Sequence, residues 1–146
     1  MNKIIIYITL AVFLLGLGAS WVIQKANSSY DIPLVKSVPV FEFKTQDKIL
    51  FSNKDLMGKI TVLDFMFTLC AGPCPVMTNN MTLLYRDYEN VDNAQFVSIT
   101  VDPSNDNEDV LKQYSIANGV NDNRWQFLTS DIDSIKKLKR DGFMLY

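Results

Sequence analysis

The sequence predicts an α/β fold, in which parallel strands lie at the centre of a sheet and helices flank them. Three observations carry this prediction. From residue 38 onward, short runs of β-branched and aromatic residues alternate with segments of helical periodicity. Residues 59–68 (KITVLDFMFT) are apolar on both faces except at Asp64, which predicts a central buried strand. The length of 146 residues allows one domain with a core of ordinary size.

The chain begins with an uncharged apolar segment. Residues 4–23 carry no charge, and roughly 20 residues are needed to cross the hydrocarbon core of a bilayer. Because Lys3 and the amino terminus precede this segment, we expect residues 1–23 to form a single-pass membrane anchor, with a cytoplasmic N-terminus and an exported remainder. A signal peptide cleaved near Gly18 and Ala19 is the alternative, although the apolar run exceeds the roughly 7–15 residues typical of such a peptide.

The following segment, residues 24–37, mixes Asn, Ser, Lys and Pro without periodicity, so we expect a linker. The domain beyond it would face an oxidising compartment, where two thiols tend to form a disulfide unless they are kept reduced or bound to a metal. No Arg-rich and Ser-rich amphipathic transit peptide is visible in the sequence. A bacterial envelope is therefore favoured over a mitochondrion.

The globular domain, residues 38–146, is predicted to begin with a hairpin. Residues 40–43 alternate as in a short strand. Residues 48–51 (KILF) resemble the partner of that strand, after a turn at residues 45–47. The first secondary structure after the linker is therefore expected to be antiparallel.

Capping residues predict where two helical segments begin and end. Ser52, followed three residues later by Asp55, predicts a single helical turn that Gly58 closes. Asp106 offers an N-cap for a longer helix that follows, and Gly119 is placed to end this helix.

Apolar spacing predicts two helices and two more strands. After the cysteines, residues at i, i+4 and i+8 spacing indicate an amphipathic helix of about a dozen residues, namely Val76, Met77, Met81, Leu84, Tyr85 and Tyr88. The strand candidates are residues 95–101 and 124–128. A final helix has apolar positions at Ile132, Ile135 and Leu138, and a basic face that we expect to be solvated, formed by Lys136, Lys137, Lys139 and Arg140.

Charge and composition exclude several classes of function. With 14 basic and 16 acidic side chains, the chain has a net charge of −2 and lacks the basic field that binds nucleic acid. The absence of histidine excludes a histidine-based catalytic triad and any histidine-containing metal site within this chain. Two cysteines exclude a four-cysteine zinc site, yet they allow one disulfide or one two-sulfur metal site.

The two cysteines, Cys70 and Cys74, lie between a predicted strand and a predicted helix. Residues four apart can lie one helical turn from each other, about 6 Å between Cα atoms, which is within the range of a disulfide. Pro75 is tolerated only in the first turn of a helix, so we expect one or both sulfurs at the helix N-terminus, where the thiolate is stabilised. The pair can oxidise or hold one metal ion. The alternative is two packed side chains or a structural disulfide.

Two further groups of residues are candidate ligands. Met66, Met77 and Met81 carry thioethers that can bind a soft metal, but their spacing on strand and helix favours core packing. Asp102 and Asp106 follow a strand, at the end where α/β sheets gather their sites. Turn and cap chemistry accounts for both aspartates without a ligand role, and we prefer that interpretation.

The motifs together resemble the SCO/SenC family, membrane-anchored proteins of thioredoxin-like fold that deliver copper to cytochrome c oxidase. The resemblance includes the anchor and, from residue 38 to about 143, the early hairpin and a series of motifs. The motifs are Leu56-x-Gly58-Lys59, Asp64-Phe65-x-Phe67-Thr68-x-Cys70, Cys74-Pro75-x-Met77-Thr78, residues 98–103 followed by Asp106, and Trp125-x-Phe127-Leu128-Thr129. It implies a central mixed sheet with flanking helices and an N-terminal hairpin extension. It also implies that Cys70 and Cys74 bind copper as thiolates, and that a downstream histidine supplies a third ligand.

The sequence departs from this pattern at its end. It contains no histidine, and it stops at Tyr146, where the family fold would continue with a β-hairpin and a closing helix. We therefore expect the C-terminal elements of the fold to be missing from this chain. Two thiolates still suit Cu(I), which prefers soft sulfur ligands.

Three functions are consistent with these features. The first is a copper-binding assembly factor that carries copper on Cys70 and Cys74 and delivers it to the copper-site subunit of cytochrome c oxidase or to another copper-site protein. The second is a thiol–disulfide reductase that keeps the cysteines of such a protein reduced. The third is a non-catalytic membrane module whose two sulfurs only brace the fold. We rank them in this order.

Overall fold

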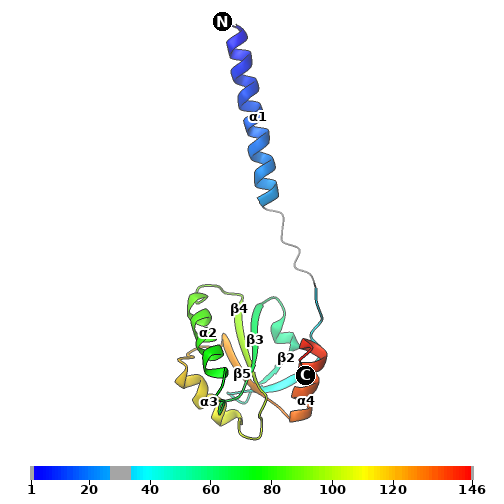
Figure 1. The fold of residues 1–146 in the computed structure, drawn as a ribbon, viewed down its shortest axis with the longest axis vertical. Helices are drawn as coiled ribbons and strands as arrows, with labels where there is room; N and C mark the ends of the chain where they lie inside the picture. The colour runs from blue at the N-terminus through cyan, green and yellow to red at the C-terminus, as the bar shows by residue number, and fades with distance from the viewer. Residues whose placement is uncertain (1, 27–33, 146) are drawn as a thin grey trace. The chain divides into compact units, whose positions relative to one another are not determined.

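The computed structural model describes residues 2–26 and 34–145. The chain divides into two compact units, residues 1–35 and residues 36–146. The first unit contains helix α1 (Asn2–Ala26) (Figure 1). Within the described residues, no helix combines the length and the apolar character that spanning a membrane requires. Residues 27–33 of the predicted linker lie outside the described residues.

The second unit is built on one five-stranded mixed sheet with the order β2-β1-β5-β4-β3. Strands β3, β4 and β5 are parallel, and β1 is antiparallel to both β2 and β5. The strands span Glu42–Thr45 (β1), Leu50–Ser52 (β2), Ile60–Met66 (β3), Ala94–Thr100 (β4) and Trp125–Thr129 (β5). The predicted α/β class, with a mixed sheet, an N-terminal hairpin and parallel strands, is confirmed.

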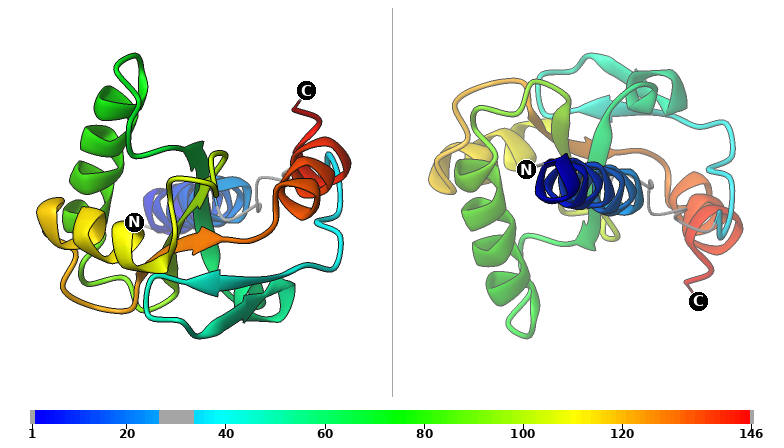
Figure 2. Two further views of the ribbon diagram at one scale, coloured as in Figure 1. Left: turned by 90° about the horizontal axis from the view of Figure 1, so that it is seen from below. Right: turned by 90° about the horizontal axis from the view of Figure 1, so that it is seen from above.

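Three helices flank this sheet, and their bounds are Cys74–Asp87 (α2), Glu108–Ala117 (α3) and Ile132–Phe143 (α4). Helices α2 and α3 lie side by side, apart from α4 (Figure 2). Consecutive side chains of β4 lie on opposite faces of the sheet. Phe96 packs with residues of α2 and α3, while Val97 packs with residues of α4, so the helices cover both faces. All seven residues of β4 are buried, as expected for a strand covered on both faces.

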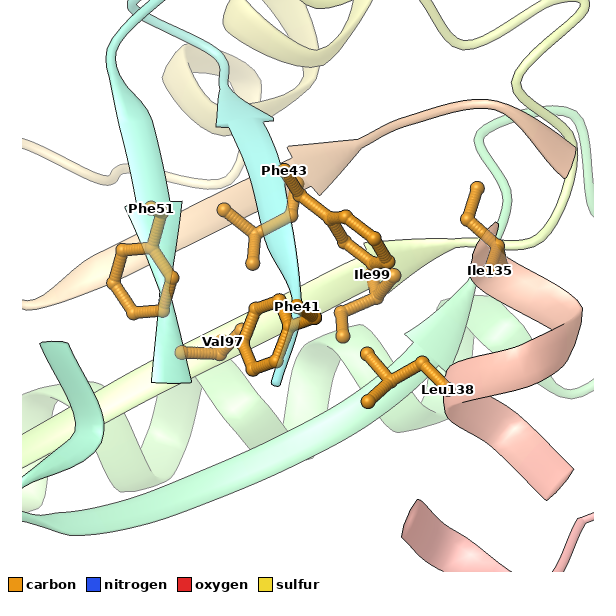
Figure 3. Close-up of a cluster of buried hydrophobic side chains, with 8 residues drawn as sticks. Phe41, Phe43, Phe51, Val97, Ile99, Ile135 and Leu138 are labelled. Carbon is orange, nitrogen blue, oxygen red and sulfur yellow. The ribbon is translucent and has the colours of Figure 1, made fainter. Parts of the chain in front are cut away.

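The core on the α4 side joins the hairpin to the last helix (Figure 3). Three phenylalanines of the hairpin region pack there against aliphatic side chains of β4, β5 and α4. The members are Phe41, Phe43, Phe51, Val97, Ile99, Leu128, Ile135 and Leu138. Ile135 and Leu138 are the predicted apolar positions of the final helix, and both are buried. Their burial confirms the predicted inner face of α4.

The core on the α2 side lies beneath the cysteines. Its buried members are Met66, Cys74, Met81, Tyr85, Phe96, Leu111, Trp125 and Phe127, and Cys70 packs against them. The rings of Trp125 and Phe127 stack with centroids 5.0 Å apart, and the ring of Tyr85 lies 5.6 Å from that of Trp125. Aromatic packing of this kind supports the last turn of α2, where Tyr85 lies, against the start of β5.

The predicted helical turn after the hairpin forms as a 3₁₀ helix, η1 (Asn53–Leu56). The backbone amide of Ser52 donates a 2.8 Å hydrogen bond to Oδ2 of Asp55, and the amide of Lys54 donates to Oγ of Ser52. This reciprocal pattern is the predicted capping pattern. Gly58 follows with a φ of +73°, a conformation that favours glycine.

The position predicted for residues 59–68 is wrong in one respect, because β3 lies at the edge of the described sheet and not at its centre. Met66 is buried against α2, while Leu63 and Phe65 pack on the α4 side, so both faces are covered near the end of the strand. Ile60, at the start of β3, is 64% exposed. Apolar residues on both faces of a strand indicate that both faces of the sheet are covered. They do not indicate whether the strand lies at the centre of the sheet or at its edge.

The predicted buried face of α2 is also partly wrong. Val76 is 65% exposed and Tyr88 is 49% exposed. The buried face consists instead of Cys74, Thr78, Met81, Thr82 and Tyr85. Threonines can occupy this face because their hydroxyls are paired: Oγ1 of Thr82 donates to the carbonyl oxygen of Thr78 at 2.9 Å, and Oγ1 of Thr78 lies 2.9 Å from the hydroxyl of Tyr114.

Candidate functional site

The two cysteines lie where strand β3 passes into helix α2. Strand β3 ends at Met66, the backbone amide of Cys70 donates a 3.3 Å hydrogen bond to the carbonyl oxygen of Phe67, and α2 begins at Cys74 itself. Pro73 is the N-cap and makes no side-chain capping bond. Pro75 occupies the first turn, where its missing N–H removes no helical hydrogen bond. The predicted arrangement of strand, cysteine loop and helix N-terminus is therefore observed.

The two thiols are free, and they lie in different environments. Cys70 is half-buried, whereas Cys74 is only 6% exposed. A hydrogen bond from the Cys74 thiol lowers the pKa of Cys70, and backbone amides of the loop add to this effect. Burial raises the pKa of Cys74, and the hydrogen bond with Cys70 acts in the same direction. Cys70 is thus the accessible sulfur that ionises first, and Cys74 is the protected thiol behind it.

Two of the three candidate methionines pack in the same core as Cys74. Met66 and Met81 are buried in the same core cluster as Cys74. Met77 is 37% exposed on the first turn after Cys74. The packing of Met66 and Met81 confirms the core role that the sequence favoured, whereas that prediction is wrong for Met77, which is exposed on the helix surface.

Asp106 does not cap helix α3, which corrects the sequence-based prediction. The N-cap is Asn107, whose Oδ1 accepts a 3.0 Å hydrogen bond from the amide of Val110. Asp106 is completely buried and turns toward the cysteine loop, where its Oδ2 accepts a 3.0 Å hydrogen bond from the amide of Thr68. The same oxygen accepts from Oγ1 of Thr100 at 2.6 Å. The predicted N-cap was one residue too early, because Asp and Asn both suit an N-cap position and the sequence places Asp106 directly before Asn107.

Asp102 makes the turn contacts that the sequence favoured. Its Oδ1 accepts from Oγ of Ser104 at 2.5 Å, and its Oδ2 accepts from Nδ2 of Asn105 at 2.6 Å. These two hydrogen bonds lower the pKa of Asp102. The carboxylate of Asp102 therefore accepts hydrogen bonds within the turn between β4 and α3, as expected for a turn residue.

Asp64 is a buried group that sequence reasoning identified only as a break in an apolar strand. Both of its carboxyl oxygens are buried, and neither has a hydrogen-bond partner among the described residues. Burial raises the pKa of Asp64, and the nearby hydroxyl of Ser98 partly offsets this shift. Its charge adds a small contribution to the raised pKa of Cys74. A single acidic residue in an otherwise apolar strand was the available signal for this feature.

The chemistry available at this site comes from sulfur. Within residues 2–26 and 34–145, no group of three or more His, Cys, Asp or Glu side chains is arranged to hold a metal ion. Two thiols at one helix N-terminus can hold a soft ion between them or be oxidised together to a disulfide. The half-buried Cys70 gives either reaction access from solvent.

Comparison with known proteins places these features in one family. The sequence profile described as SCO1/SenC matches residues 34–146. The SCO1 protein homolog of Bacillus subtilis (strain 168) is 37% identical over 99 residues, which is 66% of this chain and 51% of the relative. The chain thus corresponds to roughly half of that relative's length, and it covers 40% and 58% of two others from Rickettsia.

Two solved structures share the fold. BsSco, described as a member of the Sco family of cytochrome c oxidase assembly proteins in which a disulfide switch was identified, superposes with a TM-score of 0.70 at 31% identity and covers 77% of this chain and 67% of its own. ScoI of Bradyrhizobium japonicum with copper bound gives a TM-score of 0.63 at 25% identity, over 70% of this chain and 64% of its own. A profile match across the whole of the second unit, together with these likenesses, shows that the chain belongs to the SCO1/SenC family.

Proposed function

We propose that this protein is a copper-binding assembly factor that holds copper on the thiolates of Cys70 and Cys74. The observation that carries the proposal is the pair of free thiols at the N-terminus of α2, one accessible and of lowered pKa, the other protected. A relative of the same fold has been solved with copper bound.

Copper in its reduced form is the metal that this donor set suits best. Thiolates are soft ligands and select Cu(I) over harder ions such as Mg²⁺ or Ca²⁺. Because this chain contains no histidine, a third ligand of that type has to come from outside the sequence described here. Transfer to a recipient would then proceed by exchange of sulfur ligands, starting at the accessible Cys70.

The proposed recipient is a copper-site subunit of cytochrome c oxidase or another copper-site protein. BsSco, a relative of similar fold, is described as belonging to a family of cytochrome c oxidase assembly proteins. The net charge of −2 supports no nucleic-acid partner.

A competition titration tests copper binding. The full chain, reduced and kept in detergent, is titrated with Cu(I) in the presence of a chromophoric Cu(I) chelator. We expect one Cu(I) per chain, and a loss of affinity of about a hundredfold or more in the Cys70→Ser, Cys74→Ser double variant. Met77→Leu is the matched control, because it removes an exposed sulfur near the site and leaves both thiols in place. Unchanged affinity in the double variant would defeat the proposal.

A thiol–disulfide reductase is the second candidate, and the unequal environments of the two thiols favour it. An accessible thiolate followed by a protected thiol is the arrangement of a nucleophile and a resolving cysteine. This candidate requires that a Cys74→Ser variant trap a mixed disulfide with a substrate protein through Cys70. Failure to trap any such species, with copper binding intact, would leave the assembly factor as the function.

For its location, we propose that residues 1–23 anchor the chain in a bacterial membrane, with the N-terminus in the cytoplasm and the cysteine domain on the exported side. The support is the uncharged run of residues 4–23, preceded by Lys3. Protease treatment of spheroplasts tests this arrangement. Digestion of the domain without disruption of the membrane is the expected result, and full protection would contradict it.

A further inference from the structure

We propose that Asp106 is the positioning residue of the cysteine pair: its buried carboxylate fixes the leading end of the cysteine loop, and thereby keeps the two thiols close enough to act together. The proposal rests on the proposed function only in taking Cys70 and Cys74 as the reacting pair. Its consequence for the disulfide can be measured without copper.

The first step is the set of contacts that Asp106 makes. Its carboxylate accepts from both the backbone amide and the hydroxyl of Thr68, which lies 38 residues away in sequence, and from the hydroxyl of Thr100 at 2.6 Å. Asp106 is 0% exposed and Thr100 is 0% exposed. A buried hydrogen bond to a charged acceptor contributes more than one between neutral groups. The buried carboxylate therefore ties the residue after β3 to the end of β4.

The second step is the short separation in sequence between Thr68, which Asp106 holds by hydrogen bonds, and Cys70. Thr68 precedes Cys70 by two residues, and the turn closed by the amide of Cys70 on the carbonyl of Phe67 contains Thr68. The amide of Val101 donates a 2.8 Å hydrogen bond to the carbonyl of Met66, just ahead of this turn. At the start of the loop, Met66, Phe67 and Thr68 are thus each held by a hydrogen bond. At its end, Cys74 is held as the first residue of α2. With both ends fixed, the two thiols have little freedom to separate.

The third step explains why the residue is an aspartate. All three groups that face it are donors, and among the described residues no Lys or Arg forms an ion pair with it. A carboxylate has acceptor sites for all three donors, whereas an asparagine offers one oxygen and turns an N–H₂ group toward them. The amide of Thr68 and the hydroxyl of Thr100 share Oδ2, so an asparagine can keep its one oxygen there only by turning its N–H₂ group toward the hydroxyl of Thr68. Asp106→Asn therefore weakens the tie, because the acceptor loses its charge and the hydroxyl of Thr68 loses its acceptor.

The test is the equilibrium of the full chain, in detergent, with glutathione. In this reaction the Cys70 and Cys74 thiols lose two electrons and two protons and join as a disulfide, and one glutathione disulfide is reduced to two glutathione thiols. We expect the equilibrium constant for disulfide formation to fall about tenfold or more in Asp106→Asn, which corresponds to about 30 mV for a two-electron couple. Asp122→Asn is the control, because Asp122, just before β5, also accepts a backbone amide and a side-chain donor, both from Arg124, but is exposed. We expect no change there.

A second pair of variants keeps the test decisive if Asp106→Asn fails to fold. Thr68→Val removes the hydroxyl donor and keeps the backbone amide, and Thr68→Ser restores the hydroxyl. We expect Thr68→Val to lower the constant about threefold and Thr68→Ser to return it to the original value.

The outcomes separate this proposal from the proposed function. A constant within a factor of two of the original in folded Asp106→Asn, or in Thr68→Val where Asp106→Asn does not fold, overturns the positioning role. So does an equal shift in the Asp122→Asn control. If the unaltered chain binds no Cu(I) but Asp106→Asn still shifts the glutathione equilibrium, the copper function fails and the positioning role stands.

Discussion

The indole nitrogen of Trp125 donates a 2.9 Å hydrogen bond to Oγ of Ser98, on the neighbouring strand. Ser98 is also the register partner of Asp64 across β3 and β4. The Ser98 hydroxyl accepts from Trp125 and keeps its own proton, yet no hydrogen bond joins it to Asp64, whose carboxyl group has no hydrogen-bond partner among the described residues. The strand that leads to the cysteines thus contains a buried acid without a partner, which lowers the stability of the fold.

The burial of Asp64 predicts a pH-dependent stability. Its pKa in the folded protein is raised above the unfolded value of about 3.9, so its favourable contribution is complete below that value and is lost as pH rises through the folded pKa. Asp64→Asn cannot ionise, and we expect it to raise the unfolding free energy by about 1–3 kcal/mol at pH 7 relative to its effect at pH 4. Urea unfolding followed by tryptophan fluorescence at the two pH values measures this difference.

The matched control for this prediction is Asp92→Asn, at an exposed position just before β4. An exposed substitution of this kind should change stability by less than about 0.5 kcal/mol at both pH values. A larger gain for Asp64→Asn at pH 4 than at pH 7 would show that Asp64 is not a buried, unpaired acid.

The unequal thiols predict an order of alkylation. Cys70 is half-buried and its pKa is lowered by the hydrogen bond from Cys74, whereas burial raises the pKa of Cys74. At pH 7 and limiting iodoacetamide, we expect Cys70 to be modified first, with a rate that rises through a midpoint below the ordinary thiol pKa of about 8.5. Peptide mass mapping at several pH values measures both sites. Faster modification of Cys74 would contradict the assignment of Cys70 as the accessible thiolate.

The source of the lowered pKa predicts a further difference. Cys74→Ala removes the hydrogen-bond donor, so the pKa of Cys70 should rise and its alkylation at pH 7 should slow. Cys74→Ser retains an O–H donor at the same place and should retain more of the rate. Equal rates in the alanine and serine variants would mean that the helix N-terminus, and not Cys74, stabilises the thiolate.

The packing of α4 predicts a contrast between two isoleucines in one helix. Ile135 is 0% exposed in the core on the α4 side, whereas Ile132 is 39% exposed at the start of the helix. Ile135→Ala should lower the unfolding free energy by about 2–5 kcal/mol, because it leaves a cavity that the surrounding side chains fill only in part. Ile132→Ala should cost less than about 1.5 kcal/mol. Equal losses, measured by urea unfolding, would show that α4 does not dock through the face described here.

Local chemistry made much of this fold predictable. The hairpin, the capped turn at Ser52 and the helix after Asp131 follow from signals within a few residues of each position. The strand–loop–helix position of Cys70 and Cys74 was equally predictable, because Pro75 restricts where α2 can begin.

The features that sequence alone did not predict depend on residues far apart in the chain. The edge position of β3 depends on which strands pair beside it, and the buried face of α2 depends on hydroxyl partners such as Tyr114. The contact of Asp106 with Thr68 spans 38 residues, so local capping rules favoured the nearer interpretation. Long-range hydrogen bonds leave no periodic signal in a single sequence.

The most direct test of the central claim is X-ray absorption spectroscopy of the Cu(I)-loaded full chain. The account predicts two sulfur scatterers on copper, falling to one in Cys70→Ser and in Cys74→Ser, and to none in the double variant. A copper environment of oxygen or nitrogen alone, or one with sulfur that persists after both thiols are removed, would contradict the claim that Cys70 and Cys74 hold the metal.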